Sequence, residues 1–103
     1  MRLSSLQKYI LLKTAEKGGK VDRKIFRMFY ENLEKKPGKK YQEKIITKSL
    51  ERLIDRGFIT GFGKRTVRKW FITQISLTSK GRAAVKELLR EKQRKLPFRK
   101  RTK

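Results

Sequence analysis

Hydrogen-bonding and basic side chains recur at helical spacing in the middle of the chain. Lys and Arg donate to guanine acceptors and to phosphate oxygens, and the methyl group of Thr can contact the methyl group of thymine. Such residues fall three and four positions apart, and so share one face of a helix, at Lys44, Thr47, Lys48 and Arg52. Gln42 lies just ahead of them and could pair with adenine. The stretch therefore suits contact with a nucleic acid, and an ordinary solvated helix surface is the competing interpretation.

Acidic neighbours offer other interpretations of the same face. Glu51 and Asp55 lie three residues after Lys48 and Arg52, respectively, and could form surface pairs worth only a few tenths of a kcal/mol. Such weak pairs would not prevent a phosphate contact. Glu43 could accept a hydrogen bond from cytosine, but a Glu in a first turn more often serves the helix dipole.

The opposite side of this stretch is apolar and predicts the element that positions the basic face. Its apolar residues fall at Ile46, Leu50, Leu53, Ile54 and Phe58. This spacing predicts an amphipathic helix over residues 44–56 with one buried stripe, and its start is expected between Lys40 and Lys44. Gly57 is expected to end the helix, because Gly takes the left-handed conformation after a helix without steric cost.

The chain as a whole is strongly basic. It carries 31 Lys and Arg against 9 Asp and Glu in 103 residues, a net charge of +22. Self-repulsion on this scale destabilises a compact state, so a polyanionic partner is expected. DNA, structured RNA and an anionic membrane all qualify. The last expected helix has few large apolar residues to insert into a membrane, so no membrane partner is predicted.

Several chemistries lack the residues that they require. Cys and His are absent, which removes disulfides, Cys/His zinc sites, thiol nucleophiles and His bases. The sequence contains no Walker loop, no dinucleotide fingerprint and no paired metal-binding carboxylates. We therefore predict no catalytic residue, no metal and no cofactor, and a protein that is not an enzyme. With no apolar run of 18 residues and no signal peptide, a cytoplasmic, nucleoid-associated protein is expected.

Two helices are expected before residue 44. Ser4 and Gln7 have the spacing of a capping box, which predicts a first helix to about Glu16 that Gly18 ends. Residues 20–21 are expected to form a short extended piece.

The second helix is expected to begin at Asp22, a good N-cap, and to run to Leu33 or Glu34. A lysine-rich turn around Pro37 follows it, because a helix rarely crosses Pro-Gly. Two lysines at the end of this turn are candidate contacts to a nucleic-acid backbone, with a solvated basic loop as the competing interpretation: Lys39 and Lys40.

A two-stranded hairpin is expected after Gly57. Residues 58–60 and 67–77 form the predicted strands, and the glycine-punctuated segment 61–66 is predicted to be a flexible loop. The favoured buried face of the second strand is Phe71, Thr73, Ile75 and Leu77. The hairpin carries four basic residues that are candidate contacts to a nucleic acid: Lys64, Arg65, Arg68 and Lys69.

Two aromatic residues of the hairpin have competing interpretations. Phe62 and Trp70 could stack on unpaired bases, which would favour a single-stranded or RNA target. More often such rings cover the hairpin and the neighbouring helix, and packing is the favoured interpretation.

A last helix is expected after the hairpin. Thr78 or Ser79 would cap it, and its apolar stripe would be Ala84, Val85, Leu88 and Leu89. We expect one folded domain over residues 1–90 and a flexible basic tail over 91–103. The tail supplies three more candidate backbone contacts: Arg99, Lys100 and Arg101.

This element order resembles the winged helix-turn-helix family, particularly its MarR-like and PadR-like members. Residues 50–59, LERLIDRGFI, look like the end of that family's recognition helix and its entry into the wing. Residues 75–82, ISLTSKGR, look like the passage from the wing's second strand into the next helix. The resemblance implies an α+β fold, mainly α, with a three-helix core, a wing of two to three strands and a C-terminal helix.

The resemblance also implies a function. It implies a small transcriptional regulator that inserts helix 44–56 into the major groove of double-stranded DNA, with the basic wing on the flanking backbone or minor groove. The alternative is an RNA-binding or ribosome-associated winged-helix protein, which the charge and the basic tail suit at least as well. A homodimer is left open.

Overall fold

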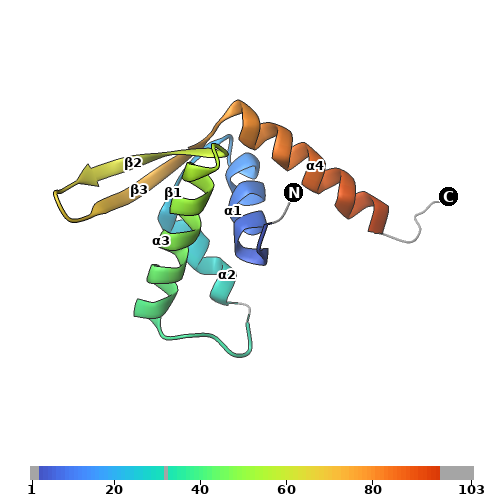
Figure 1. Ribbon diagram of the computed structural model, residues 1–103. Coiled ribbons are helices and arrows are strands. Elements are labelled where there is room, and N and C mark those ends of the chain that lie inside the picture. The colour runs from blue at the N-terminus through green and yellow to red at the C-terminus, as the bar shows by residue number, and fades with distance from the viewer. Residues whose placement is uncertain (1–2, 32, 96–103) are drawn as a thin grey trace.

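A small antiparallel sheet with helices packed on one side forms the centre of the computed structural model, which describes residues 3–31 and 33–95 (Figure 1). Its strands are β1 (Lys20–Asp22), β2 (Ile59–Arg65) and β3 (Trp70–Leu77), in the order β1-β3-β2. The helices of the described residues are α1 (Ser5–Glu16), α2 (Met28–Glu31), α3 (Lys39–Asp55) and α4 (Ser79–Lys95), and a 3₁₀ helix, η1, spans Arg23–Arg27. The predicted order of helices and strands is confirmed.

Helix α1 begins and ends where the sequence predicts. The Ser4 hydroxyl accepts a hydrogen bond from the backbone N–H of Gln7 at 3.1 Å, and the Gln7 side chain accepts one from the N–H of Ser4 at 2.9 Å. This is the predicted capping box. The chain then reverses through Gly18 and Gly19, which both have positive φ angles, and enters β1.

The second helical segment differs from the prediction. Asp22 does cap it, accepting from the N–H of Lys24 at 2.9 Å, but the chain winds first as η1 and then as α2, which ends at Glu31. The prediction of one helix to Leu33 or Glu34 was therefore wrong. Leu33 is 41% exposed and gives the helix no buried anchor at its expected end. The apolar pattern before it also does not distinguish a 3₁₀ turn from an α turn.

Helix α3 starts at Lys39 after Gly38, one residue before the predicted range of Lys40 to Lys44. The N–H of Gln42 donates to the carbonyl of Gly38 at 2.9 Å, which closes the first turn. That turn carries no core residue, so apolar spacing could not reveal it.

The C-terminal end of α3 follows the prediction. Ile46, Leu50 and Leu53 are fully buried, and Ile54 is half-buried. Gly57 has φ +82° and donates to the carbonyl of Ile54 at 2.9 Å, while Phe58 donates to the carbonyl of Leu53 at 3.0 Å. This pair of bonds is a Schellman motif, and it aims the chain directly into β2.

The hairpin is longer than expected. Strand β2 continues to Arg65, so the predicted loop over residues 61–66 was wrong. Gly61 and Gly63 lie inside this strand, at positions where a side chain would clash with its neighbours. A Cβ at Gly61 would lie 2.7 Å from the Ile54 side chain, and one at Gly63 would collide with the carbonyl of Phe71.

A β-bulge changes which residues of β3 are buried. Phe62 pairs with Gln74 and Gly63 pairs with Ile72, which leaves Thr73 as the extra residue. Strand alternation shifts at that point, so the buried residues are Ile72, Ile75 and Leu77. The prediction that Phe71 and Thr73 share the buried face was therefore wrong, because a bulge depends on the partner strand.

Helix α4 begins at a cap that also holds the end of α3. The Thr78 hydroxyl accepts from the N–H of Gly81 at 3.0 Å and donates to the carbonyl of Gly57 at 2.5 Å. Ala84, Val85 and Leu88 are buried as predicted. Leu89 was wrongly placed in this stripe, since it is 48% exposed. It lies about 100° round the helix axis from the buried Leu88.

Helix α4 continues to Lys95, past the predicted domain boundary at residue 90. The tail candidates Arg99, Lys100 and Arg101 lie outside the described residues, so the flexible tail stays a prediction. Within the described residues, no helix is both long enough and apolar enough to cross a membrane.

Candidate nucleic-acid interface

Helix α3 turns its basic side to solvent. Lys44, Lys48 and Arg52 are exposed, and Thr47 between them is half-buried. In the described part of the chain, neither of the alternative pairs, Lys48 with Glu51 or Arg52 with Asp55, forms an ion pair. The three cationic groups are therefore available to an anionic partner.

The residues at the start of α3 divide into two kinds. Lys39 and Lys40 are exposed and extend the basic surface beyond the first predicted turn. The Gln42 side chain instead turns back and donates from Nε2 to the carbonyl of Pro37 at 2.7 Å. This bond uses one of the two amide N–H groups of Gln42 and directs the amide toward the preceding turn.

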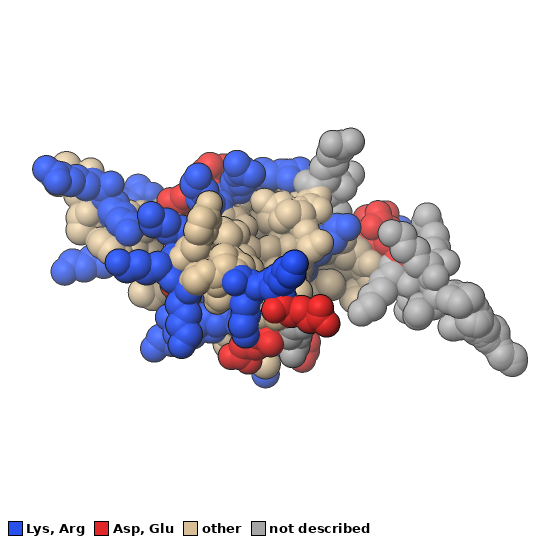
Figure 2. All heavy atoms as spheres, turned by 90° about the horizontal axis from the view of Figure 1, so that it is seen from below, with Lys and Arg blue, Asp and Glu red and all other residues tan. Residues whose placement is uncertain are grey.

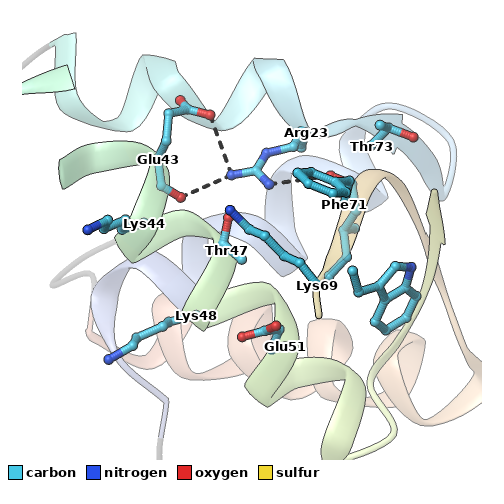
Figure 3. A pocket seen from close by; sticks show the side chains of 11 residues that line it. Arg23, Glu43, Lys44, Thr47, Lys48, Glu51, Lys69, Phe71 and Thr73 are labelled. Atoms are coloured by element: carbon cyan, nitrogen blue, oxygen red, sulfur yellow. Dashed lines mark hydrogen bonds and ion pairs between the residues drawn. The ribbon is translucent and has the colours of Figure 1, made fainter. Parts of the chain in front are cut away.

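Glu43 lies in a cluster of charges rather than on the exposed face (Figure 3). Its carboxylate accepts from Arg27 Nε at 2.8 Å and lies 3.4 Å from Arg23 Nη2. Neither interpretation of Glu43 from the sequence, as a cytosine contact or as a partner of the helix dipole, includes these arginines. The hydrogen bond to Glu43 raises the pKa of Arg27 above its ordinary value.

Arg23 joins the recognition-helix candidate to the hairpin, and no pattern in the sequence pointed to it. Its guanidinium donates to the carbonyl of Glu43 at 3.1 Å and to the carbonyl of Ile72 at 3.3 Å. Its side chain is only 17% exposed, and burial lowers its pKa below the ordinary value. This one side chain therefore links α3 to β3 and helps to set the angle between them.

The tip of the hairpin is a hydrogen-bonded turn rather than a flexible loop. Thr66 donates to the carbonyl of Lys69 from its N–H at 2.7 Å and from its hydroxyl at 3.0 Å. Lys64 and Arg68 are exposed, and the guanidinium of Arg65 lies 4.3 Å from the centroid of the Trp70 ring. The cationic side chains of the tip are therefore held on a hydrogen-bonded turn.

A groove separates the basic side of α3 from the hairpin. Lys69 points across it from the hairpin toward α3 (Figure 3). Its lining contains predicted residues from both elements: Lys44, Thr47, Lys48 and Lys69. The structure therefore brings three of the five helix candidates together with one hairpin candidate, whereas Gln42 and Arg52 do not line the groove. Lys39 and Lys40 lie at the start of α3, and the other hairpin candidates belong to β2 and the tip.

The surface around these elements is predominantly basic. Figure 2 views the molecule from below, toward the end at which α3 begins. Lys and Arg side chains crowd the hairpin end, at the left, and continue across this face, whereas Asp and Glu form small separate groups. Long-range attraction to a polyanion should therefore be strongest over α3 and the hairpin.

The aromatic residues near this surface do not all pack in the core. Trp70 packs against the core, as the favoured interpretation predicted, but Phe62 is 41% exposed and was wrongly expected to be covered. Tyr41, which the sequence did not single out as a site residue, is 63% exposed beside lysines of α3. Among the described residues, no group of three or more His, Cys, Asp or Glu could hold a metal ion.

Solved structures with a similar fold are transcription regulators. A MepR-like protein solved with pseudoligands has 28% sequence identity and a TM-score of 0.57, over 85% of this chain and 54% of its own. The adhesin competence repressor AdcR of Streptococcus pyogenes has 14% identity and a TM-score of 0.62, over 92% of this chain and 61% of its own. The C30AH42A mutant of Lactococcus lactis ZitR has 24% identity and a TM-score of 0.60, over 93% and 57%, respectively.

These neighbours are MarR-family winged-helix regulators, which are not enzymes. They confirm the predicted winged helix-turn-helix fold, which is mainly helical with a three-stranded antiparallel sheet that includes the wing. This chain spans little more than half the length of each of them. No protein-family model matches the chain, and no curated protein is significantly similar to it.

Proposed function

Starting from a winged helix-turn-helix domain that resembles those of MarR-family regulators, we propose that this protein binds double-stranded DNA and regulates transcription. Helix α3 enters the major groove, and the wing lies on the flanking backbone or minor groove. A DNA partner of this kind would place the protein in the cytoplasm with the nucleoid. Two copies could then bind the two half-sites of a palindrome.

The observation that carries the proposal is the exposed basic face of α3 beside a basic wing. Lys44 and Lys48 stand on the outer side of the helix with no ion-pair partner among the described residues. The buried stripe on the other side fixes this orientation, because turning the basic face inward would expose Ile46 and Leu50.

Different parts of the surface have different proposed roles. In this docking the first half of a recognition helix lies nearest the bases, so Lys44, Thr47 and Lys48 are proposed to contact base edges. Arg52 lies one turn further along and is proposed to contact phosphate. The remaining proposed contacts are to the backbone and minor groove: Lys39, Lys40, Lys64, Arg65, Arg68 and Lys69.

A pair of charge-matched variants tests the proposal. Lys44→Ala/Lys48→Ala removes two exposed lysines of α3, and Lys8→Ala/Lys86→Ala removes two exposed lysines of α1 and α4. Selection from a random duplex library gives the preferred sequence, and fluorescence anisotropy gives affinities at several salt concentrations. The α3 variant should lose sequence preference and reduce the salt slope by about 1 for each phosphate that the protein no longer neutralises.

The control variant should keep the preferred sequence and most of the affinity, because it changes net charge without touching α3. Equal losses in the two variants would show that only the total charge matters. Enrichment of no sequence by the wild-type protein would also count against a regulator. It would favour the RNA-binding alternative if structured RNA then competed better than duplex DNA.

A further inference from the structure

One face of the sheet is open to solvent in the described structure. Directly opposed residues of an antiparallel ladder point to the same side, so Phe62 lies beside Gln74, and Lys64 lies beside Phe71. Phe62 and Lys64 are two residues apart in β2, which places all four on one face. The helices pack against the other face, which carries buried Ile59, Ile72 and Ile75.

Two phenylalanine rings on the open face are half-exposed, and each has an ammonium group beside it. Phe62 is 41% exposed, with Lys20 Nζ 4.7 Å from its ring centroid. Phe71 is 46% exposed, with Lys69 Nζ 5.1 Å from its ring centroid. Single exposed apolar residues are ordinary, but two rings on one sheet face, each beside a lysine, form a distinct surface.

We propose that this open face binds single-stranded nucleic acid. Unpaired bases would stack on Phe62 and Phe71, and phosphates would contact Lys20, Lys64 and Lys69. Aromatic rings for stacking and cations that follow the backbone are the two parts of sequence-tolerant single-strand sites. The inference goes beyond duplex binding, because Phe62, Phe71 and Lys20 have no part in the proposed duplex contact, whereas Lys64 and Lys69 are shared with it.

The contacts already present on this face are compatible with that ligand. A cation beside an exposed ring is held more weakly than a stacked base, so a base can displace the ammonium group of Lys20 or Lys69 toward a neighbouring phosphate. Asp22 also lies on this face, and its carboxylate caps η1 through the N–H of Lys24. Gln74, exposed beside Phe62, offers a donor and an acceptor to a base edge.

The site adjoins the groove used in the proposed duplex contact. Phe71 and Lys69 both contribute to the lining of that groove, so they stand where the open face and the groove meet. A single strand leaving a duplex at the wing would therefore meet Phe71 first.

Two ring variants test the proposal. Phe62→Ala/Phe71→Ala removes both stacking surfaces, and Phe62→Tyr/Phe71→Tyr keeps them. Tyr41→Ala is the control, because it removes an exposed aromatic ring that lies on α3 instead. Fluorescence anisotropy with labelled oligothymidylate and oligouridylate distinguishes DNA from RNA as the source of unpaired bases, and circular dichroism checks that each variant is folded.

Removing the two rings should weaken single-strand binding by about 25-fold, about fivefold for each stacked base, with an unchanged salt slope because the phosphate contacts remain. The tyrosine variant should stay within about threefold of wild type, and Tyr41→Ala within about twofold. Ring-dependent binding of either oligonucleotide supports the proposal.

The proposal is overturned if the wild-type protein binds neither oligonucleotide at low salt. It is equally overturned if the double alanine variant binds as tightly as wild type, since charge alone would then explain the affinity. Duplex affinity measured on Lys44→Ala/Lys48→Ala decides the function proposed for α3 separately. If the duplex-binding function proposed for α3 fails that test, the proposal of a single-strand site is unaffected.

Discussion

Replacing Arg23 by alanine should loosen the connection between helix α3 and the wing. The Arg23 guanidinium bonds to the carbonyls of Glu43 and Ile72, which lie 20 and 49 residues away in the sequence. Arg23→Ala removes both bonds and one of the two ion pairs of Glu43. Arg27 remains beside Glu43, so the carboxylate keeps one partner.

The expected loss of stability follows from these contacts. Each hydrogen bond contributes a net of about 0.5–1.5 kcal/mol, and the side chain is only 17% exposed, so water replaces the missing bonds incompletely. Partial desolvation of the guanidinium, which lowers its pKa, offsets some of the stabilisation from these hydrogen bonds. A net loss of about 2 kcal/mol is therefore expected, or a fall of about 8–16 °C in Tm for a domain of this size.

Urea unfolding followed by circular dichroism measures this loss. Arg27→Ala is the matched control, since it removes the other arginine of Glu43 from an exposed position and should change stability much less. The reasoning fails if Arg23→Ala unfolds within about 0.5 kcal/mol of wild type, the usual range for neutral surface substitutions. It also fails if the two variants lose the same amount, because burial would then not decide the outcome.

Three further outcomes are expected. Neutralising about six phosphates should give a log–log salt slope near −5, so doubling the salt should weaken duplex binding about thirtyfold in anisotropy titrations, whereas a salt-independent affinity would contradict it. Gly61→Ala should destabilise by about 1–3 kcal/mol in urea unfolding, because its Cβ meets Ile54 and Trp70. Gly38→Ala, with open space around its Cβ, should cost only about 0.5 kcal/mol for a weaker N-cap of α3, and equal effects would refute this account. Ser4→Ala should cost about 1 kcal/mol by removing the capping box. The exposed neighbour variant Ser5→Ala should unfold like wild type, and an equal loss there would exclude capping as the cause.

Apolar spacing and glycine chemistry predicted the parts of the fold that depend on local sequence. The stripe through Ile46, Leu50 and Leu53 is buried as expected, and Gly57 ends α3 in a left-handed conformation. The start of α3 was predicted only as a range, Lys40 to Lys44, because its first turn, from Lys39, has no residue in the core. Spacing of buried residues carries no information where nothing is buried.

The errors in the hairpin come from interactions between strands. Gly61 has the residue type of a loop, but it lies in β2 to make room for Trp70 and Ile54. The bulge at Thr73 depends on register with β2, which the sequence of one strand does not contain. The outward direction of Phe71 follows from that bulge, and for this reason the aromatic residue was wrongly predicted to be core.

The charge of the candidate interface could be predicted from the sequence, but the side chain that connects its elements could not. Lys44, Lys48 and the wing cations follow from their position relative to the buried stripe and the hairpin. Arg23 does not, because nothing in a sequence rich in arginine distinguishes the one that is buried against two distant carbonyls.

The corner between α3 and α4 has a mechanical consequence. The Thr78 hydroxyl bonds to the carbonyl of Gly57, and Lys80 Nζ donates to the carbonyl of Arg56 at 2.8 Å. A Cβ at Gly81 would collide with the carbonyl of Phe58, so the first turn of α4 sits directly on the backbone that leaves α3. The first turn of α4 is therefore rigidly attached to the C-terminal end of α3. A force that rotates α4 would therefore also move the last turn of α3, because no flexible linker separates the two helices.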